Sequence, residues 1–406
     1  MKQILVLGAG FAGLWCAVGA QRKLRELGHQ RDATVTVVNR EPFHNIRVRN
    51  YEPDLSDVCI PLADVFEPIG VETVIGEVVE IDTARRRVSV RADAAPSDLA
   101  YDALVLALGS ELVRPPVPGL AEFGFDVDTY RAAHALDSHL RGLPATRLPG
   151  RSTVIVAGAG LTGIEVATEM PERLAHIFGS GFSPKVILVD RQPHVGSDMG
   201  EAARPVIESA LARLKVETRT GVAITNIERD RVTLSSGEAI ECATVVWCAG
   251  MRANPLLSKL GLPVDRLGRI AVDEFMRSAS IENVFAAGDV ARAQIDPAHG
   301  SVMSCQYGRP MGRYAGHNVV AYLYDRPMLP LTVDWYVTVL DLGPAGALYT
   351  KGFDRQVFAT GASAKETKRT INRQRIYPPR NRNPDDILAA AAPIVQAPPV
   401  VEQRQV

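Results

Sequence analysis

The fold is decided by ILVLGAGFAG, residues 4–13, and by its near-repeat VIVAGAGLTG, residues 154–163. Each stretch is a short apolar run followed by three glycines in the pattern Gly-x-Gly-x-x-Gly. Continuous runs rich in Val, Ile and Leu are typical of buried parallel strands. Two such strands, each turning directly into a helix, predict an α/β fold with two Rossmann-like units.

The glycine spacing has a physical reason. The first glycine permits the tight turn, the second lets the backbone approach a pyrophosphate, and the third lets helix and strand pack closely. The helix N-terminus then offers unpaired N–H groups and a positive dipole end to phosphates. Two copies predict two dinucleotide sites, and a chain that holds two dinucleotides is expected to pass electrons between them.

The end of the second strand in each unit should supply a group for the ribose. In the second unit this residue is Asp190, whose carboxylate can accept hydrogen bonds from ribose hydroxyls and repels a 2′-phosphate. NADH is therefore favoured, although Arg191 could pair with the 2′-phosphate of NADPH. In the first unit the residues are Asn39 and Arg40, and the amide can also bond a ribose.

Three further segments resemble the motifs of two-dinucleotide flavoproteins. NVFAAGD, residues 283–289, resembles their second flavin motif, in which the Asp binds the ribityl chain of FAD. Residues 101–109 and 241–250 resemble their strand-to-glycine crossovers. Because the motif order over residues 1–325 matches that family, the first fingerprint is expected to hold FAD and the second NAD(P)H.

The resemblance implies a set of contact residues for each cofactor. For FAD they are Gly8, Gly10, Phe11, Ala12, Gly13, Asn39, Arg40, Val78, Ala107, Gly109, Gly288 and Asp289. For the pyridine nucleotide they are Gly158, Gly160, Leu161, Thr162, Gly163, Asp190, Arg191, Ala249 and Gly250.

At ~150 residues per domain, a chain of 406 residues predicts two or three domains. We expect an FAD-binding domain over residues 1–115 and 252–325, with a linker and NAD(P)H-binding domain inserted at 116–251. Residues 326–376 form a small C-terminal α+β region at the acceptor site or an interface, with strand-like runs at 331–340 and 346–351. Residues 377–406 carry few large apolar groups, which predicts a disordered tail.

Composition excludes several classes of protein. A net charge of −1 does not favour nucleic-acid binding. No apolar run approaches the ~18 residues of a membrane-spanning helix, and the first strand starts too close to Met1 for a signal peptide. We expect a cytoplasmic protein; contact with the inner face of an anionic membrane and a homodimeric state are both left open.

The cysteines bear on the electron acceptor. They are Cys16, Cys59, Cys242, Cys248 and Cys305, and none forms C-x-x-C or the C-x4-C of disulfide reductases. Their spacing predicts no metal site. Sulfide:quinone reductases also differ, because they rely on several cysteines that line the flavin.

The chain most resembles type II NADH dehydrogenases, and Glu165 is one reason. It extends the second fingerprint to G-x-G-x-x-G-x-E, and in that family an acid here faces the nicotinamide and acceptor region. A carboxylate with its pKa raised by burial could tune proton delivery. The alternative is that Glu165 only caps its helix or pairs within it.

The second reason is SCQYG, residues 304–308. In type II NADH dehydrogenases an Ala-Gln pair here borders the quinone site; Gln306 matches and Cys305 replaces the Ala. A Cys at a helix N-terminus is expected to have a lowered pKa and could contact the flavin as a thiolate, or it could simply be a small packed residue. Pro310 suggests a helix start near Gln306 to Arg309, because Pro is tolerated in the first turn.

A basic helix is expected to start at Ser363, which with Glu366 has the pattern of a capping box. It could touch anionic lipid through its charges, or be a solvated surface helix or a subunit contact. Its basic residues are Lys365, Lys368, Arg369, Arg373 and Arg375.

These patterns predict hydride transfer from NADH to FAD, then electron transfer to a quinone near Gln306 without proton pumping, with Glu165, Gln306 and Cys305 as catalytic candidates. Three alternatives stay open. One is an NAD(P)H-dependent reductase of a small electron-transfer protein, one a reductase of an organic substrate, and one a flavoprotein redox sensor.

Overall fold

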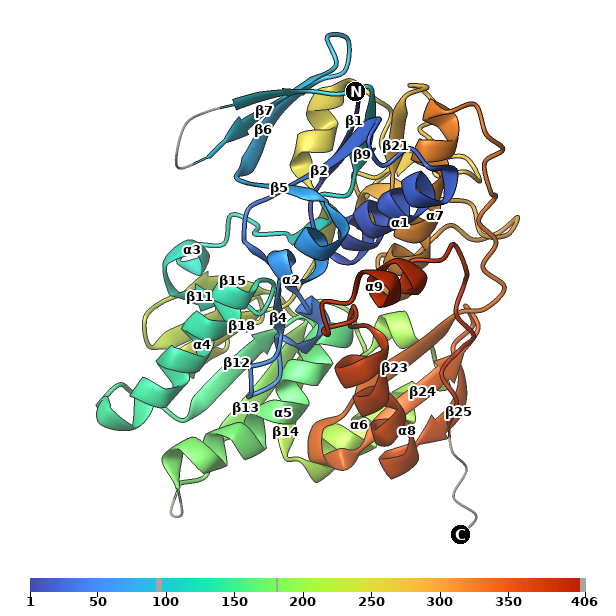
Figure 1. Ribbon diagram of the computed structural model, residues 1–406. Helices are drawn as coiled ribbons and strands as arrows, with labels where there is room; N and C mark the ends of the chain where they lie inside the picture. Colours follow the sequence, from blue (N-terminus) through green and yellow to red (C-terminus); the bar gives the residue numbers. More distant parts are fainter. Residues whose placement is uncertain (93–96, 180–181, 402–406) are drawn as a thin grey trace.

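A computed structural model describes residues 1–92, 97–179 and 182–401. It contains two five-stranded parallel sheets (Figure 1), which confirms the predicted fold class. The first has the order β21-β9-β1-β2-β5 and the second the order β11-β18-β12-β13-β14. The strands of the first are β21 (Val284–Ala286), β9 (Ala103–Leu106), β1 (Lys2–Leu7), β2 (Ala33–Asn39) and β5 (Glu72–Ile75). Those of the second are β11 (Gly124–Phe125), β18 (Thr244–Trp247), β12 (Thr153–Ala157), β13 (Lys185–Asp190) and β14 (Val216–Thr220).

The two sheets are built in the same way. In each, the central strand β1 or β12 is buried and leads into the fingerprint helix, α1 (Phe11–Leu27) or α5 (Leu161–Phe178). A three-stranded antiparallel sheet then precedes the crossover strand β9 or β18. These antiparallel strands are β6 (Glu77–Asp82), β7 (Arg87–Arg91), β8 (Ser97–Ala100), β15 (Ile224–Ile227), β16 (Arg231–Leu234) and β17 (Ala239–Glu241).

One short ladder joins the two units. Strand β10 (Ser110–Leu112) pairs antiparallel with β19 (Met251–Ala253), so the chain leaves the first unit and returns to it at the same place. The other elements are β3 (Phe43–Asn45), β4 (Cys59–Pro61), α2 (Leu62–Phe66), α3 (Leu120–Phe123), α4 (Tyr130–Gly142), α6 (Arg204–Arg213), β20 (Ile270–Ala271) and β22 (Ala291–Arg292).

Helix α7 (Cys305–Leu323) covers α1 at close range (Figure 1). A Cβ added to Gly312 would lie 2.2 Å from the carbonyl oxygen of Ala12, and one on Gly316 2.2 Å from that of Cys16. The two backbones can therefore approach closely only because these residues are glycines. No helix in the described parts of the chain is both long and apolar enough to cross a membrane.

The C-terminal region is an antiparallel sheet of β23 (Val337–Asp341), β24 (Ala347–Lys351) and β25 (Gln356–Thr360), followed by α8 (Gly361–Thr370). In Figure 1 it lies at the lower right, beside α5. Two sequence expectations fail here. Residues 331–336 are not strand, and α8 begins at Gly361, so Ser363 lies inside the first turn and caps nothing.

The predicted disorder of residues 377–406 is wrong for residues 377–401; residues 402–406 lie outside the described part. This segment contains α9 (Pro384–Ala390), which packs against α1 (Figure 1). Its few apolar groups are well placed, since Ile387 is fully buried. Asn383 caps the helix by accepting from the backbone N–H of Asp385 at 2.9 Å, and Arg382 pairs with Glu67 at 2.9 Å. Low hydrophobicity was therefore offset by local capping and by ion pairs.

Candidate functional site

The first fingerprint has the geometry that a dinucleotide pyrophosphate requires. A Cβ on Gly8 would lie 2.4 Å from the carbonyl oxygen of Ala107, and one on Gly13 would lie 1.8 Å from that of Gly8. These glycines are therefore needed for strand and helix to pack. A Cβ on Gly10 would meet no atom within 4 Å, so the space in front of this residue is open. The residues present fit the flavin nucleotide predicted here.

The second fingerprint repeats this arrangement. A Cβ on Gly163 would lie 1.7 Å from the carbonyl oxygen of Gly158, and one on Gly158 would lie 3.0 Å from Ala249. At Gly160 the nearest atom is a carboxylate oxygen of Asp198, 3.7 Å away. Again the first and third glycines serve packing and the second borders open space.

The predicted ribose residues also hold the fingerprint turns. The Asn39 side-chain oxygen accepts from the Ala9 N–H at 2.9 Å. Asp190 accepts from the Ala159 N–H and from the Gln192 N–H, the latter at 2.7 Å. Both side chains are only partly buried, so lone pairs remain for a ribose. The neighbours predicted with them, Arg40 and Arg191, are exposed.

The Gly288–Asp289 motif lies directly against the first fingerprint. A Cβ on Gly288 would be 2.8 Å from that of Ala12. Asp289 accepts from the Ser110 hydroxyl at 2.6 Å, and burial raises the pKa of its carboxyl although Ser110 and Arg47 oppose this. The fold thus brings together the flavin residues predicted from the two ends of the first unit.

The other predicted cofactor residues lie as follows. Phe11, Leu161 and Thr162 open their helices, Ala107 continues from β9 into the turn at Gly109, and Ala249 and Gly250 follow β18. Val78 is half-buried in β6, where it pairs with Val90 across the ladder.

The first turn of α7 abuts the flavin motif. Ser304 caps it by accepting from the Tyr307 N–H at 3.4 Å, and the helix begins at Cys305. A Cβ on Gly308 would lie 3.6 Å from that of Phe11. The helix starts slightly earlier than expected, so Pro310 lies inside it rather than in its first turn.

The expected low pKa of Cys305 is wrong. Burial raises the pKa of this thiol, and the nearby charges of Arg309 and Lys368 only partly oppose the effect. Desolvation disfavours the thiolate more than the helix N-terminus and two cations favour it. A neutral, packed thiol is the form that this site favours.

Gln306 anchors the segment that leads into β23. Its amide nitrogen donates to the carbonyl oxygen of Trp335 at 3.2 Å, and its amide oxygen accepts from the Val337 N–H at 3.4 Å. Both ends of the amide are thus engaged by backbone, which fixes the orientation of the side chain.

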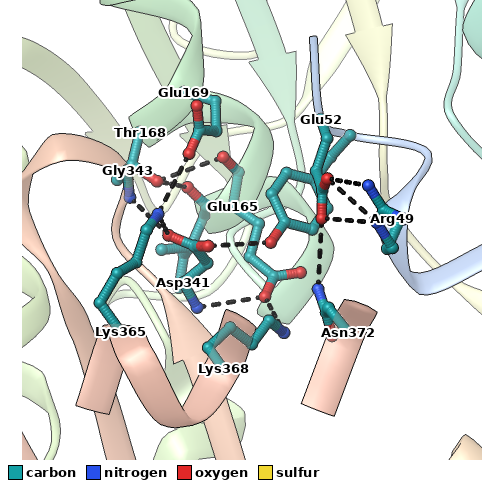
Figure 2. A network of polar contacts seen from close by, with 12 residues as sticks. Arg49, Glu52, Glu165, Thr168, Glu169, Asp341, Gly343, Lys365, Lys368 and Asn372 are labelled. Atoms are coloured by element: carbon teal, nitrogen blue, oxygen red, sulfur yellow. Dashed lines mark hydrogen bonds and ion pairs between the residues drawn. The ribbon is translucent and has the colours of Figure 1, made fainter. Parts of the chain in front are cut away.

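Glu165 is buried and lies at the centre of an ion-pair network (Figure 2). Its carboxylate accepts from the Lys368 ammonium at 2.7 Å and from the Asp341 N–H at 3.1 Å. Both partners come from the C-terminal region, so Glu165 is neither a cap nor a pair within its own helix. Burial raises the pKa of Glu165, and Lys368 opposes the shift.

The network continues from Asp341 (Figure 2). Its carboxylate accepts from the Tyr51 hydroxyl at 3.0 Å and pairs with Lys365, which also lies 3.4 Å from Glu169. Burial and the nearby carboxylates raise the pKa of Tyr51, so its hydroxyl stays protonated and can donate. Burial lowers the pKa of Lys368, but Glu165 outweighs it and the net shift is upward.

This network corrects the expectation for the basic helix. Lys365 and Lys368 point inward from α8 and are mostly buried, so they are not available to lipid or solvent. Arg369 and Arg373, by contrast, keep 60% of their side-chain surface exposed. The positive surface of this helix is smaller than its sequence suggests.

Strand β23 connects all of these groups. Gln306 binds the backbone at its start, Lys368 donates to its Val339 carbonyl at 3.0 Å, and the Asp341 N–H at its end donates to Glu165. Sequence reasoning found Glu165 and Gln306 but missed the three partners Tyr51, Asp341 and Lys368. The one available signal was Lys365-x-x-Lys368, which places two ammonium groups on one helix face.

Comparison with known proteins identifies the family. Residues 2–312 match the model of the pyridine nucleotide-disulphide oxidoreductase family. The chain belongs to this family. Membership implies an oxidoreductase with FAD and a pyridine nucleotide, and the fit of both fingerprints agrees with it.

Several relatives extend this result. An NADH dehydrogenase-like protein of Mycobacterium tuberculosis is 56% identical over 98% of this chain and 100% of its own length. A demethylphylloquinone reductase of Synechocystis is 26% identical over 85% of this chain and 86% of its own. Among solved structures, NDH2 from Plasmodium falciparum has a TM-score of 0.76 at 11% identity and covers 96% of this chain and 97% of its own. The last comparison concerns the fold alone.

Proposed function

We propose that this family member is an FAD-dependent NADH:quinone oxidoreductase. The observation that carries the proposal is that Gln306, from the first unit, and Glu165, from the second, both bind strand β23. One strand therefore contacts a candidate acceptor residue from each unit, Gln306 at its first residue and Glu165 at its last. The names of the mycobacterial and cyanobacterial relatives support NADH as donor and a quinone as acceptor.

Some residues of the chain would bind the two nucleotides, and others would supply protons. Asp190 would hold the ribose of NADH and disfavour NADPH, and Asp289 would hold the flavin side chain. Bound FAD would supply the chemistry that accepts a hydride from NADH and passes electrons to the second substrate. The fingerprint helices orient both nucleotides by their N-termini.

Reduction of a quinone also needs protons, and the buried pair supplies a candidate source. The proton shared between Lys368 Nζ and Glu165 Oε1, which lie 2.7 Å apart, is held inside the protein. Burial raises the pKa of Glu165 towards neutral pH. Proton transfer is most efficient when the pKa of the group lies near the pH at which the enzyme works. We propose that Glu165 relays protons to the acceptor and that Gln306 borders its binding site.

Contact with a membrane follows from a lipid-soluble acceptor and belongs to the same proposal. The exposed Arg369 and Arg373 could add attraction to an anionic surface. A homodimer stays a prediction.

A reductase of an acidic electron-transfer protein is less favoured. It would need an open basic surface, yet Lys365 and Lys368 are mostly buried, and Arg380 and Arg382 are already paired with acids of the first unit. A strong loss of rate with added salt would favour this alternative over a quinone.

The test is a double-mixing stopped-flow experiment on flavin-loaded protein. NADH should bleach the oxidised flavin band, and a soluble quinone should restore it rapidly. The Glu165→Gln variant should keep FAD and bleach normally but recover about 10- to 100-fold more slowly. The exposed Glu366→Gln is the matched control on α8 and should behave as wild type. Bleaching without recovery in the wild type would overturn the quinone assignment.

A further inference from the structure

A second group of buried cations lies away from the Glu165 network, between α1, α7 and the C-terminal segment. Arg309 and Arg313 sit one turn apart on α7 and are only 7% and 2% exposed. Their guanidinium carbons lie 5.6 Å and 4.5 Å from the centre of the Trp15 ring on α1. Both cations therefore stack over one indole, in the region where α7 covers α1 (Figure 1).

These two arginines have no acidic partner among residues 1–92, 97–179 and 182–401. Arg309 donates to the side-chain oxygen of Gln396 at 3.0 Å, which is a neutral acceptor. The buried Nε atoms of Arg309 and Arg313 have no hydrogen-bond partner in the same described ranges. On α1, the carboxylate of Glu26 already pairs with two cations of its own helix.

Burying these two guanidinium groups without an acidic partner is energetically unfavourable. A charged side chain is almost never fully buried unless it is paired, because desolvation is not repaid. Burial lowers the pKa of Arg309 to about 10 and that of Arg313 to about 9, and the repulsion from Arg375 adds to both shifts. The cation–π contacts recover only a part of the cost.

We propose that Arg309 and Arg313 form a binding site for a small anion that carries a carboxylate or phosphate group. Guanidinium groups match the geometry of both by paired N–H···O bonds. The anion would take the place of Gln396, whose segment after α9 has no regular secondary structure and covers the site. The backbone of the neighbouring Ala397 is held there by Arg375.

The site is also connected to the start of α7. Arg309 lies one turn after Cys305, and its charge partly opposes the burial that raises the pKa of that thiol. An anion on Arg309 would cancel part of this charge next to the residues that border the acceptor region. The proposal does not depend on the identity of the acceptor.

The experiment measures thermal unfolding of flavin-loaded protein in inorganic phosphate, in malonate and in sodium chloride at equal ionic strength. Phosphate or malonate should raise Tm by about 1–3 °C over chloride, with saturation. A response to only one of the two identifies the group that the site accepts. Equal Tm in all three salts would overturn the proposal.

Variants tie the response to the arginines. Arg313→Met should abolish the anion-specific shift while FAD stays bound. Gln396→Glu supplies a carboxylate from the chain itself, so it should raise Tm in chloride and remove the added effect of the anion. Its control, Gln396→Met, should keep the response. These Gln396 variants test the site even if Arg313→Met fails to fold. An undiminished anion response in Gln396→Glu would refute the proposal. Loss of FAD from Arg309→Met would also refute it, because the arginines would then bind the phosphates of the flavin.

Discussion

The two fingerprint units have the same backbone but different surroundings. The Gly8 N–H donates to the carbonyl of Val38 at 2.7 Å, and that of Gly158 to the carbonyl of Val189 at 2.8 Å. Both helices begin at an extended glycine and continue with the same first bond of 3.0 Å. Local sequence is therefore enough to build the same turn twice.

The difference appears two residues after the third glycine. In the first unit this residue is Trp15, which stacks with the arginines of α7, and in the second it is Glu165, which pairs with Lys368 of α8. The equivalent position thus meets cations in both units, but from different parts of the chain. A repeated motif fixes the nucleotide turn, and the later segments that cover it give each unit its own chemistry.

The largest expected effect comes from the third glycines. Gly13→Ala would bring a Cβ to 1.8 Å and Gly163→Ala to 1.7 Å from a backbone oxygen. Each substitution should lower the free energy of unfolding of its own unit by about 4 kcal/mol or more. Gly13→Ala should lose flavin, whereas Gly163→Ala should keep flavin and lose its reduction by NADH. Flavin absorbance and NADH titration check this.

The second glycines provide the control for that experiment. Gly10→Ala meets no atom within 4 Å, so the protein should fold normally and lose only flavin affinity. If Gly163→Ala bound NADH as tightly as the wild type, the equivalence of the two units would be refuted.

The next effect concerns the buried pair. Lys368→Met leaves the Glu165 carboxylate buried without its cation, which should cost about 3–5 kcal/mol in the free energy of unfolding. The double variant with Glu165→Gln should recover a part of this loss, because no buried charge of the pair remains. Urea unfolding measures both, and the exposed Arg369→Met should change little. If the change in free energy of unfolding of the double variant equals the sum of the changes in the two single variants, the two groups do not interact.

The fingerprint loops should also differ in their response to pH. The Ala9 carbonyl accepts from the His44 ring at 2.8 Å, whereas the Ala159 carbonyl accepts from the backbone N–H of Gly196 at 2.9 Å. Burial lowers the pKa of His44 to about 4. The unfolded chain, with a His pKa of ~6.5, then binds more protons, so stability is lost as pH falls from about 6.5 to 4.

Over this pH range, His44 should lower the free energy of unfolding by about 3 kcal/mol. His44→Gln can still donate to the Ala9 carbonyl and should reduce the acid sensitivity by that amount. His317, whose pKa burial also lowers to about 4, is present in both proteins and cancels in the comparison. An unchanged profile of Tm against pH for His44→Gln would contradict the prediction, and the exposed His194→Gln serves as control.

The smallest effect is on nucleotide choice. Asp190→Asn gives the second unit the residue type that Asn39 has in the first, and an amide does not repel a 2′-phosphate. The ratio of kcat/KM for NADH to that for NADPH should fall about 10-fold, which is ~1.4 kcal/mol. Arg191→Gln should shift the ratio the other way, since it removes a partner for that phosphate. A constant ratio in both would remove these two residues from nucleotide selection.

Most of the cofactor architecture could be predicted because its signals are local. Glycine spacing, apolar strands and the ribose residues that follow them act within a short stretch around each fingerprint, whereas the distant Gly288–Asp289 motif was assigned by resemblance. The acceptor side was predicted less well. Glu165 and Gln306 were found by resemblance. The low pKa expected for Cys305 was wrong, and Lys365 and Lys368 of the basic helix are mostly buried, because burial depends on contacts that neighbouring residues do not determine.

The sequence by itself determined two parallel-sheet units with nucleotide turns, since steric rules for glycine and the burial of apolar runs act over short stretches of chain. Only the tertiary structure decided what surrounds them. Glu165 and Lys368 are 203 residues apart, and Glu165 and the Asp341 backbone are 176 apart. The ordered tail likewise depends on contacts with α1 and α2. A charged group interacts with the residues that the fold brings close to it, and a short-range sequence pattern does not determine which residues these are.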